Sequence, residues 1–269
     1  MKTLNMIRTS MLMLLTGVMS VGFVACSDDD EPDDATVGIV NPSNVFTGDR
    51  PKSVSGVSIA YNAEGLAAGM ITGSKRITFE YHNVTRAVNK QHYVKMTVVD
   101  EEYDGKFIFD MELNEKGFVK YCEQTEPDGD IETWDFGYTA EGNLNYMKRS
   151  EGGNEVTNMV YENGNIIKTS MASEEDSDVK HEYTISYTSD SVETPIENKG
   201  CLMLFDTTFG VDMDEMKYAY YAGLLGKATK HLPVKNNEDE FVWTLNNDGY
   251  PIEMNLESMY EDDTFTFEW

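Results

Sequence analysis

The residues that could carry catalysis or bind a metal are four histidines, three cysteines and 48 aspartates and glutamates. The histidines lie far apart in the sequence and lack the spacing of metal ligands: His82, His92, His181 and His231. The sequence contains no zinc-protease, nucleophile-elbow, phosphate-loop, Cys-x-x-Cys or dinucleotide-binding motif. We therefore expect no cofactor and no metal site, and the sequence names no catalytic residue and no binding residue.

The carboxylates are too numerous for the sequence to identify any one of them as a catalytic acid or a metal ligand. Two acids held roughly 5–10 Å apart could hydrolyse a glycosidic bond, but 48 acids form such pairs by chance. The acidic loops 127–130, 174–176 and 261–263 could offer oxygen ligands to calcium, although none matches the Asp-x-Asp-x-Asp-Gly pattern. The plain interpretation is turns and sheet edges. A hydrolase would require a cleft in which one acid has a raised pKa.

The formal net charge is −27, from 21 basic and 48 acidic residues. Affinity for a nucleic-acid backbone comes mainly from Lys and Arg, and the sequence shows no basic patch that could supply it. We therefore expect no nucleic-acid partner.

Residues 1–25 differ in kind from the rest of the chain. Lys2 and Arg8 are the only charges, and the apolar run 11–25 is interrupted by Gly, Ser and Thr. A membrane span needs about 20 apolar residues, which this run does not supply. The pattern predicts a signal peptide over residues 1–25.

The stretch Phe23-Val24-Ala25-Cys26 resembles a lipobox, the site at which bacterial lipoproteins are cleaved and acylated on cysteine. The acidic run after Cys26 resembles the export signal of lipoproteins displayed on the surface of Bacteroidetes. These resemblances imply lipidation at Cys26 and an outer-membrane lipoprotein exposed at the cell surface. The alternatives are an ordinary secreted protein and an anchor that faces the periplasm. Residues 26–52 are expected to form an acidic flexible tether.

Two cysteines remain once Cys26 is lipidated, Cys122 and Cys201. An exported protein can form a disulfide between them. Free cysteines also pack well as small buried hydrophobes. The sequence leaves both alternatives open.

From residue 54 onward, apolar and polar residues alternate with period two. Such alternation is typical of antiparallel strands with one packed face and one wet face. The inward sets are Ile77, Phe79, Tyr81; Phe107, Phe109, Met111, Leu113; Trp134, Phe136, Tyr138; Tyr183, Ile185, Tyr187; Phe241, Trp243, Leu245; Ile252, Met254, Leu256; and Phe265, Phe267, Trp269.

A hairpin unit repeats within this pattern. A strand runs into a short turn that contains glycine, and an apolar residue opens the next strand; glycine supplies the positive φ that such turns need. The turns are 61–66, 113–118, 138–144, 161–166 and 245–250. The sequence therefore predicts a mainly β fold, a single β-rich domain over residues 54–269 built from successive antiparallel hairpins.

One segment has helical spacing instead. Asp212 and Glu215 fit a capping box, and Gly226 and Pro233 act as stop signals. We expect one inserted helix near 212–224 that plugs or caps the sheet. Its aromatic cluster 218–221 is expected to serve the core rather than a ligand.

The hairpin units, the segment 198–201 leading through 212–216 to 231–233, and the ending 247–251 plus 265–269 resemble a known family. It is the Bacteroidetes surface lipoprotein family of unknown function with a porin-like fold. The resemblance covers residues 54–269 and implies that the sheet is curled into a barrel-like fold on a lipid-anchored protein. It transfers no catalytic or binding residue. Insertion as a membrane barrel is disfavoured, because membrane strands need about 9–11 residues and the alternating runs are mostly shorter.

These observations predict a lipid-anchored cell-envelope protein, not an enzyme, that acts as a surface-exposed binding or interaction module for a glycan or a protein. Its expected partners are the outer membrane, through the lipid anchor, and that ligand; its oligomeric state is not predicted. Tyr103 and Tyr250 are the candidate loop aromatics for sugar stacking. The alternatives are a carboxylate-dependent surface hydrolase and a purely structural envelope component.

Overall fold

The computed structural model describes residues 39–82, 93–103, 105–176, 180–258 and 262–269. The predicted signal peptide, Cys26 and the predicted tether up to residue 38 lie outside these ranges. The described strands form a 15-stranded antiparallel sheet, and neighbours in sequence are mostly neighbours in space. Its order is β12-β11-β10-β9-β8-β7-β6-β5-β4-β3-β2-β1-β15-β14-β13.

The strands are β1 (Ser53–Val54), β2 (Val57–Tyr61), β3 (Ala67–Thr72), β4 (Lys75–His82), β5 (Tyr93–Asp100), β6 (Gly105–Leu113), β7 (Val119–Thr125), β8 (Ile131–Tyr138), β9 (Leu144–Arg149), β10 (Glu155–Glu162), β11 (Asn165–Ser173), β12 (Lys180–Thr184), β13 (Glu240–Leu245), β14 (Pro251–Glu257) and β15 (Asp263–Glu268). The helical segments are η1 (Pro42–Asn44), α1 (Glu151–Asn154), α2 (Phe205–Phe209), η2 (Asp214–Met216) and α3 (Lys217–Tyr221).

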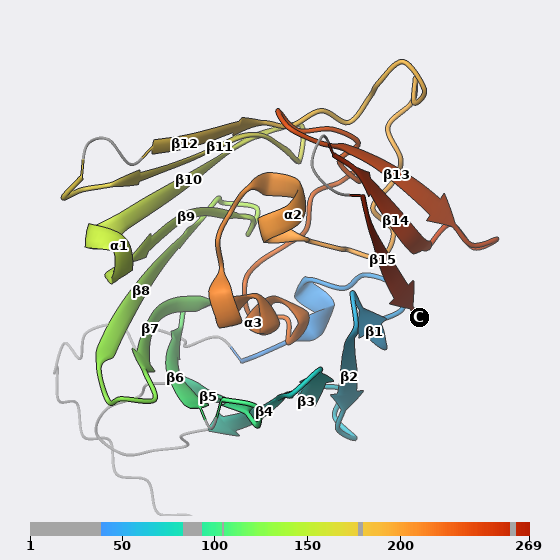
Figure 1. The fold of residues 1–269 in the computed structure, drawn as a ribbon. Coiled ribbons are helices and arrows are strands. Elements are labelled where there is room, and N and C mark those ends of the chain that lie inside the picture. Colours follow the sequence, from blue (N-terminus) through green and yellow to red (C-terminus); the bar gives the residue numbers. More distant parts are fainter. Residues whose placement is uncertain (1–38, 83–92, 104, 177–179, 259–261) are drawn as a thin grey trace, which may run out of the picture. The chain divides into compact units, whose positions relative to one another are not determined.

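The sheet curls on itself, so that its two edge strands, β12 and β13, approach each other (Figure 1). The mainly β, barrel-like expectation is confirmed, with one qualification: the two edges do not pair as strands. Lys235 lies between them, and it forms isolated bridges with Ser186 just after β12 and with Glu240 at the start of β13. The barrel-like sheet therefore has a seam that a single short segment bridges.

The predicted hairpin repeat is confirmed, and its turns share one construction. In three of them an asparagine side chain accepts two backbone N–H groups from residues two and four positions later; these are Asn62, Asn114 and Asn246. Just before five of the turns the register shifts by a β-bulge, at Tyr61, Leu113, Tyr138, Tyr161 and Leu245. A bulge increases the local twist of a strand, which helps the sheet to curl.

Because the strands run up and down, alternate turns lie at opposite ends of the sheet. We call one the glycine-turn end; it carries the turns 62–66, 114–118, 139–143, 163–164 and 246–250. We call the other the acid-turn end; it carries the turns 73–74, 101–103, 126–130, 150–154 and 174–176. The two ends place different side chains around the interior of the sheet.

The inward faces of the strands build the core, largely as the alternation predicts. Met96 on β5, Phe109 and Met111 on β6, and Trp134 on β8 are fully buried. The prediction is wrong for Leu245 and Ile252, which are each 38% exposed. The bulge between Thr244 and Leu245 interrupts the alternation there, because it shifts the register by one residue.

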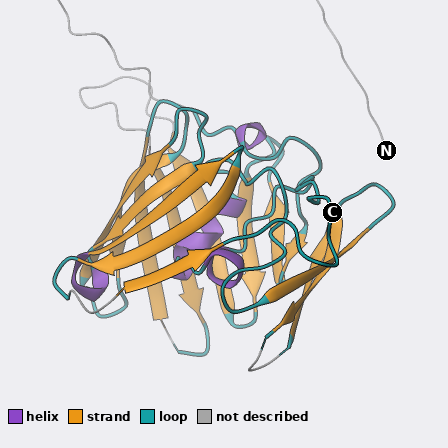
Figure 2. Ribbon diagram, turned by 90° about the horizontal axis from the view of Figure 1, so that it is seen from above, coloured by secondary structure: helices purple, strands orange, loops and turns teal. Residues whose placement is uncertain are grey.

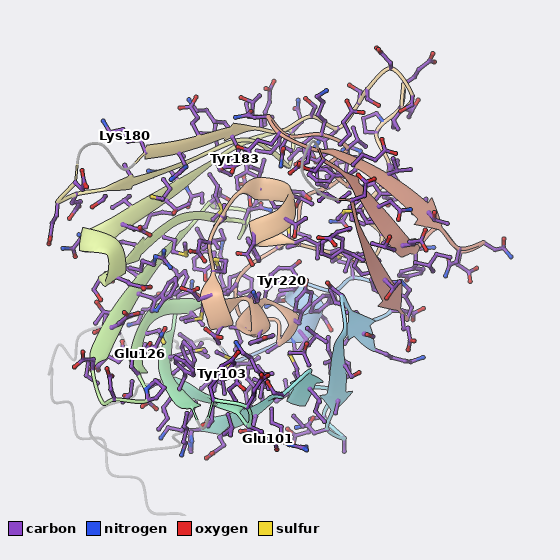
Figure 3. All side chains as sticks on the ribbon, viewed as in Figure 1. Glu101, Tyr103, Glu126, Lys180, Tyr183 and Tyr220 are labelled. Atoms are coloured by element: carbon purple, nitrogen blue, oxygen red, sulfur yellow. The ribbon has the colours of Figure 1, made fainter. Side chains whose placement is uncertain are left out.

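The interior of the curled sheet holds α2, η2 and α3 (Figures 1 and 2). The predicted helix near 212–224 is thus shorter, at residues 214–221, and α2 was not predicted. Asp212 is not the N-cap residue, because η2 begins at Asp214 and its N-cap is Met213. The Asp212 carboxylate instead binds Arg149 and accepts the Asp214 N–H. The role as a plug agrees with the burial of all four residues of the cluster 218–221, among them Tyr220 in the interior of the curled sheet (Figure 3).

The described part of the predicted tether, residues 39–52, differs from that prediction. Val45 and Phe46 are 2% and 3% exposed, and the Phe46 ring contacts the ring of Tyr220 edge-on at 6.0 Å. Pro42 opens η1, and the Asn41 side chain accepts the Ser43 N–H. The folded domain therefore begins before residue 52.

Cys122 and Cys201 are both buried as free thiols, so the disulfide left open by the sequence is not formed. Cys122 lies on β7, where burial raises the pKa of its thiol well above the ordinary value. Both cysteines pack as small apolar side chains. Within the ranges given above, no helix has the length and apolar character to cross a bilayer.

Candidate functional site

A cavity of about 630 Å³ lies at the glycine-turn end, and we call it the aromatic cavity. Its walls come from the segment 39–43, Arg50, the turn after β2, the last residues of β4, and Val94 and Leu113 on β5 and β6. Its volume is in the usual range for sites that bind small molecules.

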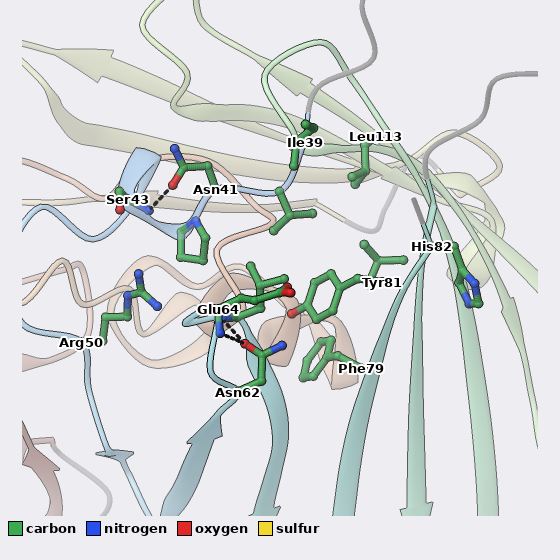
Figure 4. A pocket seen from close by; sticks show the side chains of 14 residues that line it. Ile39, Asn41, Ser43, Arg50, Asn62, Glu64, Phe79, Tyr81, His82 and Leu113 are labelled. Atoms are coloured by element: carbon green, nitrogen blue, oxygen red, sulfur yellow. Dashed lines mark hydrogen bonds between the residues drawn. The ribbon is translucent and has the colours of Figure 1, made fainter. Parts of the chain in front are cut away.

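Two stacked rings form one wall of this cavity. Phe79 and Tyr81 project from the end of β4, with ring centroids 6.4 Å apart and an interplanar angle of 21° (Figure 4). The Tyr81 hydroxyl donates to the Ala67 carbonyl at 2.9 Å, which fixes the ring. Burial raises the pKa of this hydroxyl far above the physiological range, so Tyr81 stays neutral. The wall is therefore rigid, aromatic and uncharged.

Polar groups face this wall from the other side of the cavity (Figure 4). Arg50 donates to the Gly65 carbonyl, and its guanidinium lies 5.6 Å from the centroid of the Tyr61 ring. Asn62 uses its side-chain oxygen in the turn, where Glu64 and Leu66 donate their N–H groups to it. The amide nitrogen of Asn62 and the carboxylate of Glu64 thus face the cavity as a donor and an acceptor.

An aromatic wall opposite donors and acceptors suits a ligand with one apolar face and several hydroxyl groups, such as a saccharide. The polar groups are of both signs, so the cavity does not favour a strongly charged ligand.

The two loop tyrosines proposed from the sequence behave differently from each other. Tyr103 is 77% exposed beyond β5, as predicted for a loop aromatic. Tyr250 is buried at 7% exposure, and its ring packs on Trp269 with centroids 4.9 Å apart. Its hydroxyl accepts the Asp49 N–H, so Tyr250 fastens the start of the domain to its last residues and offers no sugar platform.

A second cavity, of about 530 Å³, lies at the acid-turn end, and we call it the acidic cavity. Glu126, Glu132, Glu151, Asp214 and Glu215 line it together with Asp128 and Asp130 of the predicted loop 127–130. The sheet and the interior plug therefore both contribute carboxylates to it. Among the described residues, no group of three or more His, Cys, Asp and Glu side chains is arranged to hold a metal ion.

Arg149, at the end of β9, lies beside this cavity with a side chain only 9% exposed. Its guanidinium binds Glu155 at 2.6 Å, Asp214 at 2.7 Å and Asp212 at 3.1 Å, and Glu151 lies at 3.4 Å. One arginine thus ties the plug segment to the sheet.

Three carboxyls of the acidic cavity hold protons more tightly than usual. Burial raises the pKa of Glu126 above its ordinary value. Burial, reinforced by the Glu151 and Glu126 charges, raises the pKa of Glu132 to about 7. Burial and the neighbouring Asp212 raise the pKa of Asp214 to about 6, despite the attraction of Arg149. The structure thus contains the cleft with a raised acid pKa that the hydrolase alternative requires.

The sequence did not indicate Phe79, Tyr81, Arg50, Asn62 or Glu64 as site residues. Phe79 and Tyr81 follow the inward pattern of β4, so they read as ordinary core. They border a cavity because they lie near the end of β4, where the segment 39–43 and the turn after β2 form the other walls, which is a feature of tertiary structure. The fixed place of Asn62 in its turn was the one local signal.

A curled antiparallel hairpin sheet that encloses a short helical plug defines the class of this domain. The chain belongs to the family described as a domain of unknown function (DUF4595) with porin-like fold, whose model matches residues 59–253. This match confirms the predicted membership in a family of unknown function with a porin-like fold. It assigns no activity to any residue.

Among solved structures, the chain is similar to a porin-like protein from Bacteroides uniformis ATCC 8492. The TM-score is 0.57 at 16% sequence identity, over 79% of this chain and 89% of that chain. A likeness at this identity supports the fold alone. No curated protein matches the sequence.

Proposed function

We propose that the domain is a saccharide-binding module whose ligand occupies the aromatic cavity. The observation that carries the proposal is the pairing of a rigid aromatic wall, Phe79 and Tyr81, with donors and acceptors from Arg50, Asn62 and Glu64. The rings offer an apolar face to the sugar C–H groups, while the polar groups take its hydroxyls.

The test is a glycan array probed with the purified protein, followed by calorimetric titration of each glycan that binds. Replacement of Glu64 by Gln keeps the size of the side chain and removes an acceptor charge, so affinity should fall about tenfold, or ~1.4 kcal/mol. The matched control is Glu141→Gln, because Glu141 also precedes the glycine of a hairpin turn and does not line the cavity.

An unchanged affinity in Glu64→Gln would show that the ligand does not bind in this cavity. Failure of every neutral glycan to bind would leave the structural alternative, an envelope component without a soluble ligand.

We also propose that the module is carried on a lipid anchor at Cys26 and displayed at the outer membrane, facing the cell exterior. The lipobox-like Phe23-Val24-Ala25-Cys26 and the acidic run after it support this proposal. Two or more acyl chains hold a protein stably at a bilayer. Metabolic labelling with an alkynyl fatty acid should tag the protein and fail to tag Cys26→Ser. Added protease should degrade it on intact cells if it faces outward.

A second candidate function, hydrolysis by paired carboxylates, rests on Glu132 in the acidic cavity. A pKa of about 7 would let this carboxyl donate a proton at neutral pH, and Asp214 or Glu126 could serve as the second acid. Turnover of any glycan on the same panel that disappears in Glu132→Gln would favour this function over binding alone. Absence of turnover in the unsubstituted protein would remove it.

A further inference from the structure

A third cavity, of about 450 Å³, lies at the glycine-turn end on the other side of the segment 39–50 from the aromatic cavity. We call it the lysine groove. Lys199, Lys227 and Lys230 line it, with Glu197 as its single acidic residue. Asn44, Thr47 and Tyr250 supply further polar groups. Its lining therefore has the opposite sign to the net charge of −27.

The backbone that carries two of these lysines is held firmly against the hairpin turns. Lys227 donates its backbone N–H to the Gly142 carbonyl at 2.9 Å, and Lys230 donates its backbone N–H to the Gly164 carbonyl at 2.9 Å. The glycine turns of successive hairpins thus fix the backbone positions from which both lysine side chains project. Neither contact uses the lysine side chain.

The third lysine is held by its side chain. Lys199 donates to the Asp248 carbonyl, and its ammonium nitrogen lies 4.8 Å from the centroid of the Tyr250 ring. The ring and a carbonyl orient this ammonium group without neutralising it. The groove therefore has one ammonium group with a fixed position, that of Lys199, and two on side chains that are held only through their backbone.

These lysines lack the ion pairs that most other lysines form. Among the described residues, no carboxylate oxygen lies within 4.0 Å of the ammonium of Lys199, Lys227 or Lys230. By contrast, carboxylates pair with the following lysines on the strands and the plug: Lys75, Lys95, Lys120, Lys148, Lys168, Lys217 and Lys235. The groove therefore brings together three lysines whose ammonium groups no described carboxylate approaches within 4.0 Å, in a chain with more than twice as many acids as bases.

We propose that the lysine groove is a binding site for a phosphate monoester. A phosphate monoester carries close to two negative charges at neutral pH, which matches three ammonium groups and one carboxylate. Lysine binds phosphate as a compact point charge and needs no planar bidentate geometry. A single carboxylate ligand would leave two of the cations unused. A long polyanion would meet the negative charge of the remaining surface, so the ligand is compact.

The test is calorimetric titration of the full chain, purified in a mild detergent, at low ionic strength. The probes are inorganic phosphate, glucose 6-phosphate and glucose. The test variant is the double substitution Lys227→Gln and Lys230→Gln, which leaves the backbone bonds to the turns intact. The matched control is Lys120→Gln with Lys168→Gln, which removes the same charge from exposed strand positions. Arg50→Gln tests the aromatic cavity as an alternative phosphate site.

We expect glucose 6-phosphate to bind and glucose to bind at least tenfold more weakly. Affinity for glucose 6-phosphate should fall at least tenfold in the test variant and stay within twofold in the control. Arg50 belongs to the proposed saccharide site, so a loss of affinity in Arg50→Gln that also appears with glucose reports on that site and not on the lysine groove. Equal binding of inorganic phosphate would show that the groove takes the phosphate group alone. Tighter binding of glucose 6-phosphate would show that it also contacts the sugar.

Three results would overturn the proposal. They are no saturable binding of either phosphate probe to the unsubstituted chain, equal losses in the test and control variants, and loss of binding in Arg50→Gln alone. Circular dichroism of each variant verifies that it is folded, so that a loss of binding is not a loss of structure.

Discussion

The two ends of the curled sheet are built on different physical principles. At the glycine-turn end, the turns pack against other parts of the chain: a Cβ on Gly117 would lie 2.5 Å from the Ile39 carbonyl oxygen. At the acid-turn end, Gly129 has the same kind of backbone, with φ at 95°, and a Cβ there would meet nothing within 4 Å. The turn at Gly117 thus packs against backbone, whereas the turn at Gly129 is open.

The two ends differ in the opposite way in their charged side chains, which interact closely at the acid-turn end and are largely unpaired at the glycine-turn end. The acid-turn end places Glu126, Glu132, Glu151 and Asp214 around one cavity, and it depends on Arg149 to offset their repulsion. The glycine-turn end has unpaired lysines whose positions the backbone fixes. At the glycine-turn end, backbone contacts fix the chain, so the lysine side chains are not needed for packing. At the acid-turn end, the charged side chains themselves hold the plug.

The largest effect should follow from removing the arginine on which the acid-turn end depends. Arg149→Met leaves Glu155, Asp212 and Asp214 without their shared counter-charge. Breaking a buried ion pair from one side costs about 3–5 kcal/mol, so we expect a loss of that size in the free energy of unfolding, measured by urea denaturation.

The control is Arg76→Met, because Arg76 pairs with Glu101 where both side chains are more than half exposed. An exposed pair contributes about 0–1 kcal/mol, so this variant should lose little stability. Similar losses in both variants would mean that Arg149 does not hold the plug.

The next effect separates the packed turns from the open ones. Gly117→Ala and Gly129→Ala each force alanine into a positive φ, which costs about 1 kcal/mol. Gly117→Ala must also displace the Ile39 carbonyl, so its total cost should reach about 3 kcal/mol. Thermal unfolding of the two variants measures the difference, and equal melting temperatures would show that the turn at Gly117 can yield without cost.

The same contrast explains what the sequence could predict. The hairpin repeat, the inward faces of the strands and the positions of the glycine turns depend on residues within a few positions of each other, so local patterns reveal them. The sequence predicted an exposed loop position for Tyr250, and this was wrong. The burial of Tyr250 depends on Trp269 and Asp49, and no local sequence pattern links these residues to it. Arg149 has partners 63 and 65 residues away, and its role was equally invisible.

Local patterns also misjudged short elements. The helix expected near 212–224 ends early because Gly223 adopts a φ of 81°, and α2 is only five residues long, too short for a periodic signal. The segment 39–52 is polar enough to resemble a tether, yet Val45 and Phe46 are buried, and Phe46 packs on Tyr220 of the plug. The candidate cavities lie where such elements meet the strands, which is why the sequence could not locate them.

A smaller effect concerns the pH dependence of the acid-turn end. The pKa of Glu132 is about 7 in the folded protein against an ordinary value of 4.5, so the folded state binds the proton more tightly than the unfolded state. Stability should therefore fall as pH rises from about 4.5 to 7. Glu132→Gln should flatten this slope and, allowing for partial exposure, add about 1 kcal/mol at pH 8.

The control for this prediction is Glu123→Gln, which makes the same change on the exposed face of β7. It should leave the pH slope as it is. An unchanged slope in Glu132→Gln would place the raised pKa on another carboxyl of the cavity.

For the two thiols we expect reduction to have no effect on stability. A bridge between Cys122 and Cys201 would close a loop of 80 residues and stabilise the fold by about 4 kcal/mol, since it would restrict the unfolded chain. With Cys26 replaced by serine, the urea midpoint should be the same with and without dithiothreitol, because both thiols are free. A lower midpoint under reduction would reveal a covalent link in the folded protein, and the packing of the plug would then no longer explain its stability on its own.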